Sequence, residues 1–91
     1  MDKAEFRAHL KDNGYEDMGE KEMAANHVEP THTHDFDAAI LVLSGEISAV
    51  MEDRTVTCRA GDTFSLDANT PHEERIGGEG VRFLAGRREI G

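Results

Sequence analysis

From Tyr15 onward, the chain is a series of short runs with β-type patterning, separated by Gly, Pro, Asn and Asp. Polar and apolar residues alternate in several of these runs, which is the side-chain period of a strand rather than of a helix. Seven or more short strands at such spacing predict an all-β sandwich or barrel. With 91 residues the chain is one small domain, and we expect barrel closure, a bound metal or dimerisation to add stability.

The first residues have a different pattern. Asp2 and Glu5 form a capping pair, Phe6 and Leu10 are four residues apart, and Gly14 suits the position after a helix end. We therefore predict a helix and lead-in over residues 1–14, followed by a single barrel domain over residues 15–91.

The expected strands follow from the alternation and the turn residues. Residues 38–43 and 46–51 are predicted to form a hairpin around Ser44-Gly45, because glycine accepts the positive φ of a tight turn. Further strands are expected over 54–59, 63–66, 72–76 and 81–85. The glycine-rich residues 77–80 would connect the last two.

The net charge and the cysteine content restrict the possible binding partners and the expected cellular compartment. A formal net charge of −9 argues against nucleic acid or an anionic membrane as the main partner. Cys58 is the single cysteine and lies in an alternating run, which predicts a buried, inert thiol and a reducing, cytoplasmic location. No apolar run approaches the ~20 residues that a membrane span requires.

Three histidines stand out as candidate metal ligands. His32 and His34 occur in the run Thr-His-Thr-His-Asp-Phe-Asp, which is expected to be extended, so both rings should leave one face of the chain. His72, in Thr-Pro-His-Glu-Glu, supplies a third imidazole. Neutral imidazole is a common ligand of first-row transition metals.

These residues resemble the two short motifs of the cupin superfamily, which would cover residues 26–45 and 61–76. The first motif, Gly-x5-His-x-His-x3,4-Glu-x6-Gly, is matched at His32, His34 and Gly45. The second, Gly-x5-Pro-x-Gly-x2-His-x3-Asn, is matched at Gly61 and His72. The resemblance implies a small single-domain cupin of the conserved-barrel type, with a double-stranded β-helix (jelly-roll) barrel.

The departures from the motifs are also informative. Asn26 and Asn69 replace two motif glycines, and asparagine is the residue that next most readily adopts a left-handed conformation. Asp67 and Ile76 replace the proline and the asparagine of the second motif, so no family role carries over to them. Ala38 stands where the family has a metal-binding glutamate.

Counting by twos along the strands gives the candidate site. From His72 the count places Glu74 on the interior face. Glu74 could be a fourth metal ligand, a hydrogen-bond acceptor that orients a ligating imidazole, or an acid/base group. Asp37 is a weaker candidate ligand, because it would point inward only if a bulge shifted the strand register. From His34 the count places an apolar wall on the interior face, and Phe64 is added from its own strand. The expected pocket residues are Phe36, Ala38, Ile40, Val42 and Phe64.

The resemblance implies a metal held by His32, His34 and His72, with iron or manganese favoured and zinc or nickel able to load during preparation. The first hypothesis for function is a small metal-binding cupin acting on a small molecule, with oxygenase-like or isomerase-like chemistry. The alternative is a non-catalytic module that binds or senses a small ligand, with metal structural or absent. A third hypothesis is a purely structural dimerisation domain. We also expect the chain to form a homodimer.

Overall fold

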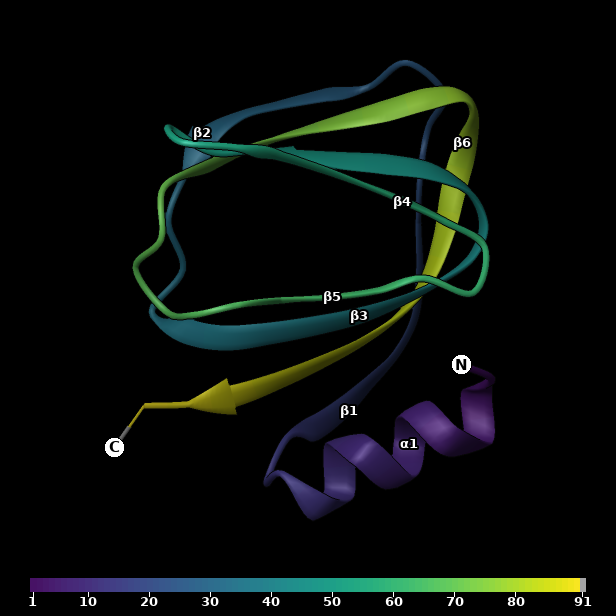
Figure 1. The fold of residues 1–91 in the computed structure, drawn as a ribbon, viewed down its shortest axis with the longest axis vertical. Coiled ribbons are helices and arrows are strands. Elements are labelled where there is room, and N and C mark those ends of the chain that lie inside the picture. The colour runs from purple at the N-terminus through teal and green to yellow at the C-terminus, as the bar shows by residue number, and fades with distance from the viewer. Residues whose placement is uncertain (91) are drawn as a thin grey trace.

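The computed structural model describes residues 1–90, which form one helix and six strands. In chain order these are α1 (Lys3–Asp12), β1 (Glu16–Met23), β2 (Val28–His32), β3 (Phe36–Val50), β4 (Thr55–Arg59), β5 (Thr63–Leu66) and β6 (His72–Glu89), as Figure 1 shows. All strand pairs are antiparallel. The predicted helix and the strand over 63–66 are confirmed.

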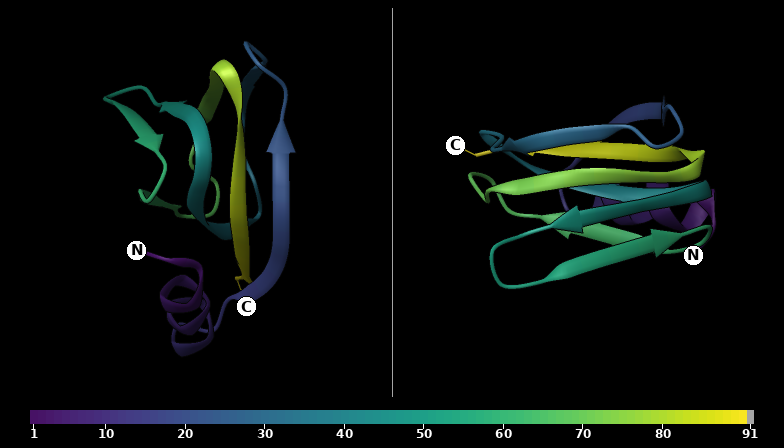
Figure 2. Two further views of the ribbon diagram at one scale, coloured as in Figure 1. Left: turned by 90° about the vertical axis from the view of Figure 1, so that its right-hand side faces the viewer. Right: turned by 90° about the horizontal axis from the view of Figure 1, so that it is seen from above.

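Two long strands, β3 and β6, form the frame of the barrel. They pair with each other from Phe36↔Glu89 to Val50↔Glu73 and pass from one layer of the barrel into the other (Figures 1 and 2). The first half of β3 also pairs with β5, and its second half pairs with β4. In the same way β6 pairs first with β2 and then with β1. The result is an all-β jelly-roll barrel with a short N-terminal helix.

The predicted hairpin at Ser44-Gly45 is wrong. Residues 36–50 form one strand, in which the register with β6 shifts on both sides of Gly45 and the strand bends. The predicted connection over 77–80 is wrong for the same reason, because residues 72–89 are one strand and Gly80 lies near Gly45. Positive φ at Gly45 (78°) and Gly80 (76°) supplies the corner of a barrel strand rather than a tight turn.

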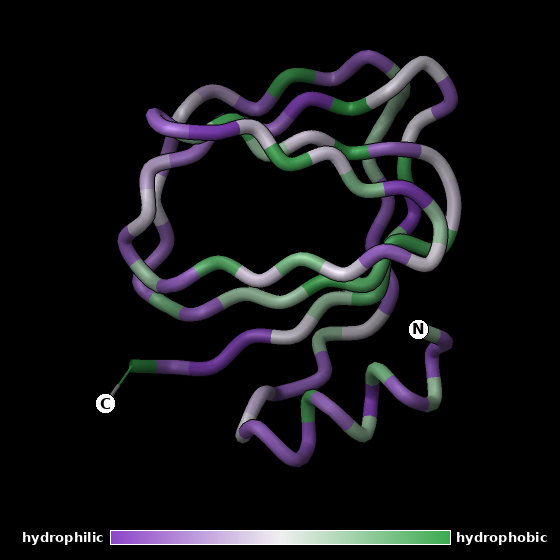
Figure 3. Tube along the Cα trace, viewed as in Figure 1, coloured by the Kyte–Doolittle hydropathy of each residue, from purple (hydrophilic) through white to green (hydrophobic). Residues whose placement is uncertain are grey.

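Helix α1 covers the outer face of one barrel layer. Its apolar side chains Phe6 and Leu10 are each 1% exposed and pack against Ala39, Leu41 and Leu84. Polar residues cover the opposite side of the helix, and Figure 3 shows apolar residues alternating with polar ones along the strands. Because the helix covers Ala39 and Leu41, both faces of this part of β3 are apolar. A second cluster, which includes Val42, Ile47 and Ile76, fills the other side.

The start of α1 carries a reciprocal capping pair. The Asp2 side chain accepts a hydrogen bond from the Glu5 backbone N–H (2.8 Å), and the Glu5 side chain accepts one from the Asp2 N–H (3.2 Å). We expect Asp2→Ala to lower the free energy of unfolding by about 1 kcal/mol, because a helix N–H loses its partner. Urea titration followed by far-UV circular dichroism measures this. Asp12→Ala, at the other end of the helix, is the matched control and should be neutral or slightly stabilising; an equal loss in both variants would contradict the capping explanation.

No helix within residues 1–90 has the length and apolar character needed to span a membrane. The division of the chain into residues 1–14 and 15–91 stays a prediction.

Candidate metal centre

The three histidines come from two neighbouring segments at one end of the barrel. His32 is the last residue of β2 and pairs across the sheet with His72, the first residue of β6. His34 lies in the connection between β2 and β3 rather than on a strand, which differs from the expected extended run. This connection and the loop of residues 67–71 lie side by side on the left of Figure 1. The barrel end therefore brings all three rings together.

The ring nitrogens converge on one point. One nitrogen from each of His32, His34 and His72 lies within 4.8 Å of the other two. The His32 Nδ1–H donates to the Pro30 carbonyl (2.7 Å), and the His72 Nδ1–H donates to the Thr70 carbonyl (2.8 Å). Since a carbonyl only accepts, both rings carry their proton on Nδ1, and their Nε2 lone pairs are free to bind a cation.

The arrangement fits a metal ion. Nε2 of His32 and Nε2 of His34 are 3.1 Å apart, and two nitrogens at ~2.1 Å from one ion, at right angles, would be about 3 Å apart. Two unprotonated nitrogens this close repel each other unless a proton or a cation lies between them. His72 is 1% exposed, and its buried Nε2 has no hydrogen-bond partner among the described residues. A bound cation would satisfy this nitrogen.

Burial and two neighbouring histidines favour the neutral form of His34. Burial lowers its pKa below the ordinary value, and repulsion from His72 and His32 adds to this effect, while Glu74 and Asp35 oppose it. The Phe36 ring stacks on the His34 ring with centroids 4.8 Å apart and planes 4° from parallel. Arg87 lies over Phe36, at 4.6 Å from the ring centroid. A neutral, fixed imidazole is the state that binds a metal.

The sequence offered two carboxylates, Glu74 and Asp37, as candidate metal ligands in addition to the three histidines. Glu74 Oε2 lies 3.6 Å from His72 Nε2, and the Glu74 side chain is 23% exposed, but the convergent group itself contains only the three histidines. Asp37 lies outside the convergent group: one carboxylate oxygen accepts from the Ala68 N–H (2.8 Å), and the other accepts from Arg88 (2.9 and 3.1 Å). These donors hold the pKa of Asp37 below its ordinary value. Its contacts direct both oxygens to partners other than a metal.

An apolar cavity of about 50 Å³ adjoins the histidines. Three of the predicted pocket residues, Ala38, Ile40 and Phe64, line it together with His34, His72 and Glu74. Two of the predicted wall residues do not line this cavity: Val42 packs in the apolar cluster with Ile47 and Ile76, and Phe36 stacks on His34. The sequence shows that apolar and polar residues alternate in the second half of β3 and in β4. Which of the two alternating sets faces the cavity depends on the bend of β3 at Gly45, which the sequence did not reveal. The lining residues missed for this reason are Ile47, Ala49, Val56 and Cys58. Leu66 was also missed, although it lies two residues after Phe64 on β5 and alternation along that strand gives it.

Cys58 is 4% exposed, which confirms the predicted burial. Burial raises the pKa of its thiol, and the charge of Asp62 acts in the same direction. The thiol is therefore protonated at neutral pH, and only the thiolate reacts with disulfide reagents. We expect the folded protein to react with a chromogenic disulfide on the order of 100-fold more slowly than the urea-unfolded chain. An exposed thiol at the next position, Thr57→Cys in a Cys58→Ala background, is the control; equally fast reaction of both would contradict the prediction.

The family comparison agrees with this geometry. The family model of the cupin domain matches residues 19–85, and the chain belongs to the cupin family. None of the curated proteins matches this chain.

Several solved structures share the fold. A protein of unknown function from Rhizobium leguminosarum bv. viciae 3841 has a TM-score of 0.74 and 19% identity, over 91% of this chain and 90% of that chain. The polyketide cyclase RemF from Streptomyces resistomycificus has a TM-score of 0.65 and 28% identity, over 79% of this chain and 58% of that chain. The DMSP lyase DddQ from Ruegeria pomeroyi DSS-3 has a TM-score of 0.68 and 24% identity, over 76% of this chain and 36% of that chain.

Proposed function

We propose that this cupin binds one divalent first-row transition metal ion through His32, His34 and His72 and acts on a small molecule next to it. The observation that carries the proposal is the set of three converging ring nitrogens, one of them buried without a partner. When bound by three imidazoles, such an ion keeps open positions at which it can polarise a substrate oxygen, activate water or bind dioxygen. Iron or manganese is the proposed physiological ion, and zinc or nickel would also bind.

The protein's own residues would have distinct roles. The Thr70 and Pro30 carbonyls accept the Nδ1 protons of His72 and His32, which would leave both Nε2 atoms available to hold the ion. Glu74 is the proposed fourth ligand or the group that moves a proton at the substrate, because it is the carboxylate that lines the cavity. Ala38, in the position of the missing glutamate, lines the cavity with His34 and His72 and would leave space beside a bound ion. The apolar lining excludes water and accepts the carbon part of a small molecule.

Two solved relatives support an activity on small organic molecules, since one is a polyketide cyclase and the other a DMSP lyase. The proposed chemistry is oxygenase-like or isomerase-like. A non-catalytic module that binds or senses a small ligand is the second candidate. Two observations favour it: Ala38 removes a ligating carboxylate, and Glu74 is the single carboxylate in the cavity lining. Fold alone does not choose between them.

The test combines metal content with turnover. Protein purified without a metal-affinity tag is analysed for metal; we expect about one ion per chain, and removal of the ion by a chelator should leave the chain folded. The loaded protein is then screened against small organic molecules for dioxygen uptake or isomerisation. Turnover that is lost in Glu74→Gln, with the metal retained, supports the enzyme. Ligand binding without turnover favours the sensing module, and a chain without metal affinity overturns the proposal.

A homodimer and a cytoplasmic location are also proposed. The small core supports self-association, and the single cysteine supports a reducing compartment. Light scattering of the purified chain tests the dimer; a 10.0 kDa species alone would overturn it.

A further inference from the structure

Asp37, three residues after His34 in the chain, forms a partly buried ion pair with Arg88. They face each other across β3 and β6, and the Asp37 side chain is 14% exposed. Arg88 donates from Nε and Nη2 to one Asp37 oxygen, at 3.1 and 2.9 Å. The other Asp37 oxygen accepts from the backbone N–H of Ala68, at 2.8 Å. A side chain at the start of β3 therefore holds the loop of residues 67–71.

This loop contacts two of the three histidines. The Asn69 N–H donates to the His34 carbonyl at 2.7 Å, and Asn69 adopts a left-handed conformation with φ of 63°. One residue further, the Thr70 carbonyl accepts the His72 Nδ1–H at 2.8 Å. The position of the loop therefore sets both the backbone of His34 and the ring of His72. A shift of the loop would turn the two nitrogens away from a common point.

Arg88 is itself held from the other side. Its Nη1 donates to the Asn13 carbonyl at the end of α1 (2.8 Å), and its guanidinium carbon lies 4.5 Å from the centre of the Tyr15 ring. The planar guanidinium uses separate nitrogens for these partners, which a lysine could not reproduce. The end of the helix and the loop are thus connected through two side chains, Arg88 and Asp37.

We propose that Asp37, oriented by Arg88, is a positioning residue that sets the geometry of the His34 and His72 nitrogens through the loop of residues 67–71. This inference rests on the proposed metal site. It assigns Asp37 a role through the loop rather than as a ligand. Residues that orient ligating histidines change metal affinity by about 10- to 100-fold when they are replaced.

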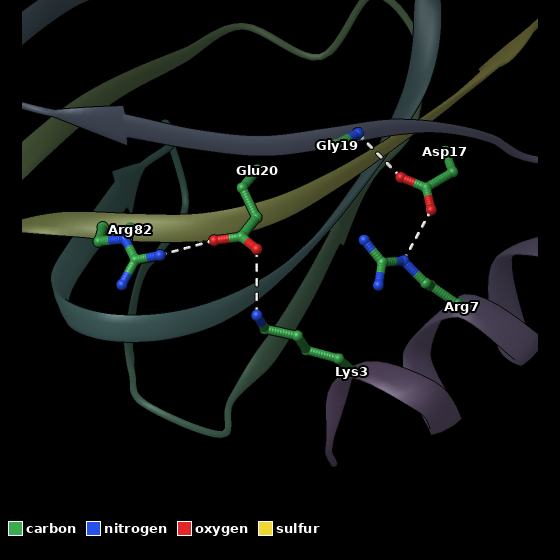
Figure 4. A network of polar contacts seen from close by, with 6 residues as sticks. All are labelled: Lys3, Arg7, Asp17, Gly19, Glu20 and Arg82. Carbon is green, nitrogen blue, oxygen red and sulfur yellow. Dashed lines mark hydrogen bonds and ion pairs between the residues drawn. The ribbon is translucent and has the colours of Figure 1, made fainter.

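A second aspartate provides a matched control. Asp17 accepts one backbone N–H, from Gly19 (2.8 Å), and pairs with one arginine, Arg7 (2.9 Å), on the outside of the barrel, as Figure 4 shows. It therefore has the same kinds of partner as Asp37 but lies away from the histidines. Loss of its carboxylate should change stability without changing the metal site.

The experiment is a titration of the metal-free protein with Co²⁺, followed by visible absorption, under conditions in which every variant is folded. We expect Asp37→Ala to weaken binding about 10- to 100-fold and to change the absorption spectrum. Asp37→Asn keeps an oxygen for the Ala68 N–H and should lose less than about 10-fold. Asp17→Ala should bind with wild-type affinity. Equal affinity of Asp37→Ala and wild type, or an equal loss in Asp17→Ala, would show a purely structural role and overturn the inference.

A second measurement separates this inference from the proposed function. Long-range proton–nitrogen NMR of the metal-free protein reports which ring nitrogen of His72 carries the proton. We expect the Nδ1–H form in the wild type and in Asp17→Ala, and a mixture of the two forms in Asp37→Ala. If the wild type binds no Co²⁺, the proposed function fails, and the NMR result still decides the positioning role: an unchanged His72 ring in Asp37→Ala overturns it.

Discussion

Replacing His72 with alanine is expected to remove stoichiometric metal binding. The other two nitrogens, on His32 and His34, would remain 3.1 Å apart, but two imidazoles alone hold an ion weakly. We expect the affinity to fall by more than about 100-fold, beyond the range seen for residues that only orient ligands. The stabilisation that a ligand at 100 times its Kd provides, about 2.7 kcal/mol, should then disappear from the urea titration. Isothermal titration of the metal-free chain with Ni²⁺ or Zn²⁺ measures the change.

The control for this prediction is His27→Ala. His27 is exposed and pairs with Glu29 (2.9 Å), away from the convergent nitrogens. It should bind metal as the wild type does. His32→Ala provides a second test at a half-buried position, where the fold is less at risk than at His72. Undiminished binding by both His72→Ala and His32→Ala would exclude the proposed ligand set.

Gly45→Ala is expected to have the largest effect on stability. A Cβ at this position would lie 2.0 Å from the Gly80 carbonyl oxygen and 2.8 Å from its carbon, with φ of 78°. Backbone atoms cannot rotate away as a side chain can, so the two long strands would have to separate at their corner. We expect a loss of about 4 kcal/mol or more, which is a large part of the stability of a small domain. Urea unfolding followed by circular dichroism measures it.

Gly19→Ala is the control that separates the cost of the steric clash from the cost of a left-handed backbone conformation. Gly19 has the same φ of 78°, and an added Cβ there would meet nothing within 4 Å. This variant should lose only the ~1–2 kcal/mol of a left-handed alanine. Similar losses in the two variants would mean that the close approach of Gly45 to Gly80 is not what limits substitution.

Local patterns in the sequence were sufficient for the helix, the β class and the three histidines. Asp2 and Glu5 act within one turn, and His32, His34 and His72 occur at motif spacing, so their convergence could be anticipated. The left-handed conformation expected of Asn26 and Asn69 is confirmed, with φ of 62° and 63°. Each of these features depends on residues close in sequence or on a spacing that the cupin motifs preserve.

Features that depend on contacts between distant residues could not be predicted. A glycine after serine has the same local pattern in a hairpin as in a bent strand, and only the pairing with β6 distinguishes the two at Gly45. Because Phe6 and Leu10 pack on the outer face of β3, that face is apolar as well as the inner one. This part of β3 therefore lacks the alternation of polar and apolar residues that would show which face is inside. The Asp37–Arg88 pair joins residues 51 apart in the chain, so no window of sequence contains it.

The central place of β6 also has a consequence for synthesis in the cell. This strand pairs with β1, β2 and β3 and supplies His72, yet it is synthesised after all the other strands of residues 1–90. Until then β1 and β2 lack the strand with which they pair among the described residues, and their backbone N–H and C=O groups stay unpaired. Chains in which many contacts join residues distant in sequence fold slowly, and they expose aggregation-prone surfaces until folding is complete. The barrel can therefore close only after β6 has been synthesised.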